Sequence, residues 1–166
     1  MQRLLTPMVF LSLLLFGASF GFFYAWVCST MWGLDTLEPN VAIMAMNAMN
    51  ISVRNGVFMP VFFGTPVVLI ATSVVAFLAG QRKVAMLIGA GGLMYIFGAF
   101  IPTGSINVPM NIALEQYNPP LIAEDADAIW AEYSPRWQFW NTFRTIVSGI
   151  TLLLVGFALY ALPRRA

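Results

Sequence analysis

Residues 136–144 read RWQFWNTFR, and the chain continues directly into the apolar segment TIVSGITLLLVGFALYAL at residues 145–162. A stretch of this length and composition is long enough to cross a bilayer as an α-helix. The nine residues before it combine two arginines, two tryptophans, a glutamine and an asparagine. Such a sequence either anchors the helix at the membrane interface or lines a site at its end.

The composition is typical of an integral membrane protein. Of the 166 residues, 60% are hydrophobic and 9% are charged, whereas soluble domains carry about 25% charged residues. The mean hydropathy is +0.80. The net charge of +1 gives no reason to expect nucleic acid as a partner.

The side chains that bind most transition metals are almost missing. Histidine is absent and Cys28 is the only cysteine, whereas haem, iron–sulfur, zinc and copper sites depend on these two residue types. We therefore expect no metal and no cofactor, and we interpret Cys28 as a small buried hydrophobic residue.

Four apolar segments predict four transmembrane helices, at about residues 4–28, 57–79, 84–102 and 136–162. We expect an all-α fold, an integral membrane four-helix bundle that forms a single domain over residues 1–166. Small residues predict close helix packing. They are the GxxxG pair Gly17 and Gly21, then Gly89, Gly91, Gly92, Ser148 and Gly149.

The charges predict an orientation. Five of the eight basic residues fall at one end of the predicted bundle, namely Arg3, Arg82, Lys83, Arg164 and Arg165. The positive-inside rule assigns that end to the cytoplasm. We therefore expect a bacterial inner-membrane protein with both termini cytoplasmic. All seven acidic residues lie in the two long segments 29–56 and 103–135, which we expect to be structured outer loops that contain short helices and carry the function.

Within the first outer segment, residues 39–55 predict an amphipathic helix. Asn47, Asn50 and Arg54 recur on one face. That face either lies in water or points into a cavity, and the sequence favours neither.

The second outer segment contains the sequence NVPMN at residues 107–111, where Pro109 should prevent a regular helix. Asn107 and Asn111 either satisfy irregular backbone, which we favour, or hold a ligand. Further on, Pro119 and Pro120 predict the start of a short helix. Ser134 and Pro135 then predict a restart, as N-cap and first residue of the last helix.

A polar and aromatic stripe follows on the last helix, because Trp137, Asn141, Arg144 and Ser148 recur at intervals of four, three and four residues. Arg144 lies deeper than the tryptophans. An ionised group at such depth normally faces the bundle interior and has a partner. The available acids are Glu115, Glu132, Asp35 and Glu38. The stripe therefore predicts either a site or a structural ion pair.

Three patterns also resemble the anthrone oxygenase-like integral membrane family. They are RNGVF at residues 54–58, NVPMN at 107–111 and W-x-x-Y-x-x-x-W-x-x-W-N-x-x-R-T at 130–145. Most bacterial members are uncharacterised, and fungal members are linked to oxidation of an anthrone to an anthraquinone without a known metal or flavin. The resemblance implies removal of a proton beside a carbonyl, after which the enolate passes an electron to O₂. Such chemistry needs a base, donors to the enolate oxygen and a dry aromatic pocket.

On this resemblance, Arg144, Asn141 and Asn111 are expected to stabilise the oxyanion. The base is Glu132, Glu115, Asp35 or Tyr133; the sequence does not select among them, and we place Glu132 among the catalytic residues. The residues expected to bind the ligand are Arg54, Asn107, Asn111, Trp130, Tyr133, Trp137 and Trp140.

Three functions fit these observations. The first is cofactor-free oxidation of a lipophilic aromatic or quinol-like substrate at the outer face. The second is binding of a lipid, quinone or pigment without turnover. The third is an accessory subunit that docks on other membrane subunits, or on copies of itself. Transport fits less well, because no charged residue interrupts the middle of any predicted span.

Overall fold

A computed structural model describes residues 2–163, and the regular structure in that range is helical. The α-helices are α1 (Gln2–Ala25), α2 (Met31–Leu34), α3 (Pro39–Ser52), α4 (Phe58–Leu78), α5 (Arg82–Tyr95), α6 (Val108–Leu114) and α7 (Ala123–Tyr160). Three π-helical turns connect some of them, η1 (Trp26–Thr30), η2 (Ile96–Phe100) and η3 (Thr103–Asn107).

Four continuous helical segments within residues 2–163 are long and apolar enough to cross a membrane. They are Arg3–Leu34, Phe58–Leu78, Arg82–Leu114 and Ala123–Tyr160. The predicted all-α fold with four membrane helices is therefore confirmed. The first and third segments extend beyond their predicted ends at residues 28 and 102, because π-helical turns continue the helix where we expected a loop.

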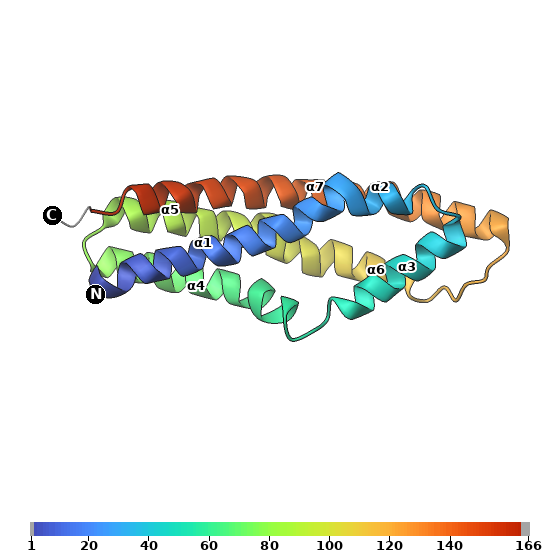
Figure 1. The fold of residues 1–166 in the computed structure, drawn as a ribbon, viewed down its shortest axis with the longest axis horizontal. Coiled ribbons are helices and arrows are strands. Elements are labelled where there is room, and N and C mark those ends of the chain that lie inside the picture. The colour runs from blue at the N-terminus through green and yellow to red at the C-terminus, as the bar shows by residue number, and fades with distance from the viewer. Residues whose placement is uncertain (1, 164–166) are drawn as a thin grey trace.

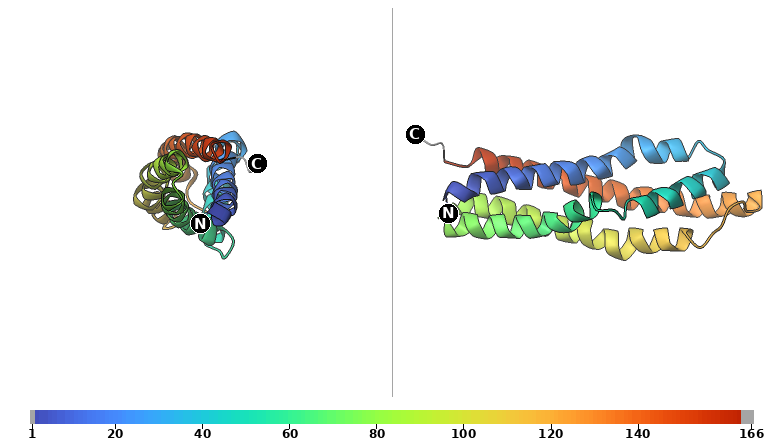
Figure 2. Two further views of the ribbon diagram at one scale, coloured as in Figure 1. Left: turned by 90° about the vertical axis from the view of Figure 1, so that its left-hand side faces the viewer. Right: turned by 60° about the horizontal axis from the view of Figure 1, so that its bottom comes forward.

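The helices form an elongated bundle (Figures 1 and 2). The start of α1, the α4–α5 turn and the end of α7 lie together at one end, which we call the turn half. At the other end, α2, α3, α6 and the first part of α7 form the cap half, where α3 continues beyond the start of α4. Arg3, Arg82 and Lys83 belong to the turn half. Arg164 and Arg165 lie outside the described residues, and the orientation stays a prediction.

Each half has its own apolar core. The core of the turn half contains Leu5, Val9, Phe16, Phe23, Phe62, Leu69, Ala76, Val84, Ala85, Ile88, Tyr95, Ala99, Val155 and Ala158. The core of the cap half contains Met31, Leu34, Ala42, Ile43, Met46, Leu114, Ala126, Trp130, Tyr133 and Trp137. The segments predicted to be structured outer loops therefore bury an apolar core of their own.

Close helix packing occurs on α5, η2 and α7. A Cβ added at Gly91 would lie 2.9 Å from Thr151 Cγ2, and one added at Gly98 would lie 2.7 Å from Val147 Cγ1. The small-residue surfaces predicted on the third and fourth helices are thus confirmed at Gly91. The GxxxG prediction is wrong within this chain, because nothing described lies within 4 Å of a Cβ built on Gly17 or Gly21.

The predicted restart of the last helix at Ser134 and Pro135 is also wrong, because α7 runs unbroken from Ala123 to Tyr160 with Pro135 inside it. Proline removes backbone hydrogen bonding locally but does not end a helix that tertiary contacts hold. Here Ser134 does not cap a helix, and its hydroxyl donates to Asp35 Oδ1 at 2.6 Å instead.

The helical path through NVPMN has a related explanation. Pro109 falls in the first turn of α6, where its missing N–H costs little. The expected interruption is a π-helical turn, η3, and not a loop. Glu124 and Asp125 occupy the first turn of α7, where the helix dipole favours acids.

Candidate functional site

Asn111 is the centre of a hydrogen-bond network that joins α3, α6 and α7. Its Oδ1 accepts bonds from the Tyr133 hydroxyl and from Trp137 Nε1, each at 2.9 Å. Its Nδ2 donates to Asn50 Oδ1 at 2.9 Å. These three bonds fix the orientation of the Asn111 amide and therefore position both aromatic rings. Asn50, which is buried, and Asn47, which donates to the Leu114 carbonyl, thus point from α3 into the protein, whereas Arg54 is exposed and pairs with Glu115.

Arg144 lies one layer further toward the turn half, with 3% of its surface exposed. Its Nη1 donates to Thr103 Oγ1 at 2.8 Å, and its Nη2 donates to Asn141 Oδ1 at 3.0 Å. Asn141 in turn donates to the Phe23 carbonyl at 3.0 Å. The guanidinium carbon lies 4.8 Å from the Phe23 ring centroid and 5.5 Å from that of Trp137. Aromatic faces are favourable neighbours for a cation in a dry site.

The predicted carboxylate partner of Arg144 is not found, and this prediction is wrong for the residues that the structure describes. Glu115 pairs with Arg54 at 2.5 Å, and Glu38 caps α3 by accepting from the backbone of Asn40 and Val41. Asp35 accepts bonds from Trp130, Ser134 and Gln138. A carboxylate costs less near water than in an apolar core, and the acids of the cap half already have these other partners.

Several buried polar atoms on α7 and on the segments that pack against it have no hydrogen-bond partner among residues 2–163. They are Arg144 Nε, the Tyr95 hydroxyl, both amide atoms of Asn107 and Ser148 Oγ. They come from α5, η3 and α7. Buried polar atoms usually have a partner, and atoms without one are candidates for contact with a bound molecule. The arrangement offers donors of hydrogen bonds around a buried positive charge.

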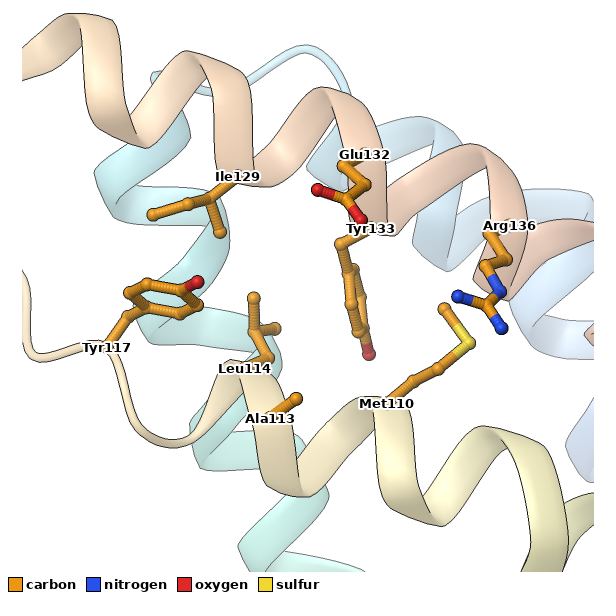
Figure 3. Close-up of a pocket in the computed structure, with 8 residues that line it drawn as sticks. All are labelled: Met110, Ala113, Leu114, Tyr117, Ile129, Glu132, Tyr133 and Arg136. Carbon is orange, nitrogen blue, oxygen red and sulfur yellow. The ribbon is translucent and has the colours of Figure 1, made fainter.

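A second feature is a pocket of about 150 Å³ between α6 and α7, shown in Figure 3. The Tyr133 ring extends from α7 toward α6, with Leu114 on one side and Met110 on the other. Glu132 also lines this pocket and is exposed. The Tyr133 hydroxyl is already bonded to Asn111.

A larger cavity, of about 450 Å³, lies between α1, the end of α3 and the start of α4. Its walls are mostly apolar and include Ser19, Phe22, Trp26, Met49, Phe58 and Val61. Trp26 connects it to the network described above, because the Trp26 and Trp137 ring centroids are 5.0 Å apart.

The structure brings together five of the predicted site residues, Asn111, Tyr133, Trp137, Asn141 and Arg144, through direct contacts. Asn107 is buried but makes no described side-chain bond. Trp130 packs against Tyr133, with ring centroids 5.7 Å apart, and bonds Asp35. The remaining ones lie elsewhere: Trp140 contacts Phe139 and Phe143, Arg54 pairs with Glu115, and Glu132 lies at the α6–α7 pocket.

The sequence reasoning missed Ser19, Tyr95 and Thr103. Thr103 lies four residues before Asn107, and this helical spacing could have identified it if the helix had been expected to continue past residue 102. Ser19 and Tyr95 are isolated polar residues inside apolar segments. In membrane helices such residues face the protein interior.

The class of protein is thus an integral membrane helical bundle with a buried, uncompensated arginine beneath an aromatic and amide network. A family model described as anthrone oxygenase matches residues 58–154, which is more than half of the chain. The protein belongs to the anthrone oxygenase family. The match includes Asn111, Asn141 and Arg144, whereas α1 and α3 lie before it. No curated protein and no solved structure matches the chain.

Proposed function

We propose that this membrane protein catalyses the O₂-dependent oxidation of a lipophilic aromatic substrate that carries an enolisable carbonyl or a phenol. The observation that carries the proposal is Arg144, a buried guanidinium that no described carboxylate neutralises and that lies against two aromatic rings. Such a charge stabilises an oxyanion that forms beside it. Membership of the anthrone oxygenase family supports the same chemistry.

For a ketone with an activated CH₂ group, the reaction starts with loss of a proton and formation of an enolate. Arg144 stabilises the enolate oxygen, and the free donors of Tyr95 and Asn107 are available to assist. The enolate passes one electron to O₂, and the resulting radical and superoxide combine to form a C–O bond. Protonation gives a hydroperoxide, which loses water. In sum, R₂CH₂ and O₂ become R₂C=O and H₂O.

The aromatic side chains keep this chemistry dry. Trp137 and Phe23 lie against the guanidinium and exclude water from it. In a medium of low dielectric constant, the interaction between the cation and the oxyanion is stronger than in water. Asn141 holds the guanidinium from one side through its Oδ1, so we assign it a positioning role.

Glu132 cannot contact the same atom as Arg144. The two residues are twelve positions apart on α7, which corresponds to about 18 Å along a helix axis. We therefore propose that Glu132, exposed at the α6–α7 pocket, receives the proton through water and does not touch the substrate.

The test measures the oxidation of anthrone by the full chain in lipid nanodiscs. The rate is followed by O₂ uptake and by the absorbance of the quinone product. Empty nanodiscs supply the rate of spontaneous oxidation. Arg144→Gln should lower the protein-dependent rate about 100-fold, and Arg144→Lys should retain part of it. Arg82→Gln, a change of the exposed arginine at the start of α5, should leave the rate within about twofold.

Two other outcomes contradict the proposal. If the protein binds anthrone but the rate equals that of empty nanodiscs, the site binds its ligand without turnover. If Arg144→Gln folds, as circular dichroism and gel filtration report, and oxidises anthrone at the wild-type rate, the buried cation has no part in the chemistry.

A further inference from the structure

The cavity between α1, α3 and α4 has the size and the walls of a small-molecule site. Its volume of about 450 Å³ falls within the range of about 300–1,000 Å³ that is usual for such sites. Three aromatic side chains form part of its wall. The ring centroids of Phe22 and Phe58 are 4.5 Å apart, and those of Phe22 and Trp26 are 6.3 Å apart.

The polar groups at this cavity differ in whether they already make hydrogen bonds within the protein. Near its rim, Ser52 donates to the Met49 carbonyl, and Asn55 Oδ1 accepts from the backbone N–H of Val57. Ser19 is different, because it is buried and its hydroxyl has only a long contact of 3.5 Å with Thr65 Oγ1.

Ser19 also lies near the Tyr95 hydroxyl, which is buried behind the cavity wall and is not part of it. That hydroxyl has no bond of good geometry in the described part of the chain. A ligand in the cavity therefore meets aromatic and aliphatic surface, with the Ser19 hydroxyl on the buried part of the wall. Hydroxyls both donate and accept, which suits a ketone oxygen as well as a phenol.

One layer of aromatic side chains separates this cavity from Arg144. Trp26, on the wall, contacts Trp137, which lies against the guanidinium. Phe22, also on the wall, is adjacent to Phe23 with a ring-centroid distance of 5.8 Å, and Phe23 also lies against the guanidinium.

We infer that this cavity binds a planar aromatic ketone or phenol that arrives from the bilayer between α1 and α4, with its oxygen toward Ser19. The inference rests on the proposed function, because it names the substrate class and the route to Arg144. A lipid acyl chain would fill apolar space but has no group for the Ser19 hydroxyl. α1 and α4 both belong to membrane-spanning segments, so a ligand dissolved in lipid reaches the opening without crossing water.

The test fills the cavity and measures binding of anthraquinone, a planar three-ring diketone that O₂ does not consume. Val61→Phe places a larger side chain on the cavity wall, and Val67→Phe makes the same change further along α4 where the side chain is 65% exposed. Binding to the full chain in phosphatidylcholine nanodiscs is followed by quenching of tryptophan fluorescence, after correction for partition into empty nanodiscs. We expect Val61→Phe to weaken binding about tenfold and Val67→Phe to change it less than about twofold.

A second variant protects the test against misfolding. Ala18→Phe fills the same cavity from α1 and should also weaken binding about tenfold. Circular dichroism and gel filtration identify folded variants. If folded Val61→Phe and Ala18→Phe bind anthraquinone as Val67→Phe does, the inference is overturned. It is also overturned if brominated acyl chains quench the cavity tryptophan and excess anthraquinone does not relieve that quenching, because lipid then fills the cavity.

The two proposals fail separately. Anthraquinone binding that Val61→Phe weakens, together with no protein-dependent oxidation of anthrone, removes the proposed function and leaves the binding site. Oxidation that depends on Arg144 but is unchanged in folded Val61→Phe keeps the proposed function and removes this cavity as its route.

Discussion

The turn half and the cap half use polar side chains in opposite ways. In the turn half, Ser12 and Thr72 share a hydrogen bond of 3.1 Å, and each hydroxyl is also within bonding distance of a carbonyl of its own helix. In the cap half, the Asn111 amide connects three helices and has no backbone partner in the described chain. The turn half is held by apolar packing, and the cap half adds specific polar partners to its own apolar core.

This difference indicates where binding chemistry belongs. A hydroxyl that donates to a carbonyl of its own helix costs little in an apolar core and needs no ligand as a hydrogen-bond partner. A network of amides and indoles positions side chains to within a narrow range, because every member depends on its neighbours. Arg144 lies where the two kinds of core meet, with polar contacts on one side and aromatic rings on the other.

Removal of Asn111 should show the largest stability effect. Asn111→Ala deprives the Tyr133 hydroxyl and Trp137 Nε1 of their acceptor and leaves Asn50 without its partner. Each buried polar group left unpaired costs about 1–3 kcal/mol, so we expect a loss of about 2–4 kcal/mol in the free energy of unfolding. Equilibrium unfolding in mixed micelles of detergent and dodecyl sulfate measures it. A loss below about 1 kcal/mol would show that water replaces the network.

The second prediction concerns close packing at glycine and compares two Gly→Ala substitutions. One should lower the stability of the protein, and the other should not. Gly98→Ala places a Cβ 2.7 Å from Val147 Cγ1, and such overpacking costs about 1–3 kcal/mol. Gly17→Ala adds a methyl group where nothing described lies within 4 Å. Because alanine favours helix over glycine by about 1 kcal/mol, it should leave stability unchanged or raise it.

Thermal melting of the two glycine variants in the same detergent provides the comparison. If Gly17→Ala destabilises the protein as much as Gly98→Ala does, the GxxxG face has a partner other than this chain, and a homo-oligomer or an accessory role gains support. Gel filtration with light scattering on both variants then decides between a second copy and another subunit.

The sequence was most informative about the membrane helices, because hydropathy and length act locally. It also placed Trp137, Asn141 and Arg144 on one face, since a helix of fixed periodicity determines which residues share a side. The predicted helix start at Ser134 and Pro135 was wrong, because the Ser134 hydroxyl bonds Asp35, which is distant in sequence. The partner of Arg144 could not be predicted for the same reason. Whether a carboxylate approaches a buried arginine depends on loop paths that no local pattern encodes.

The smallest effect is expected in the turn half. Thr72→Val keeps the shape of the side chain and removes the hydroxyl that bonds Ser12 across the α1–α4 interface. Ser12 retains the Met8 carbonyl at 2.9 Å as an acceptor, so no buried donor is left unpaired. Side-chain hydrogen bonds between membrane helices contribute about 0.6 kcal/mol on average, and we expect a loss of less than about 1 kcal/mol in the same unfolding assay. A loss comparable to that of Asn111→Ala would contradict the contrast between the halves, because it would make specific polar contacts as important in the turn half as in the cap half.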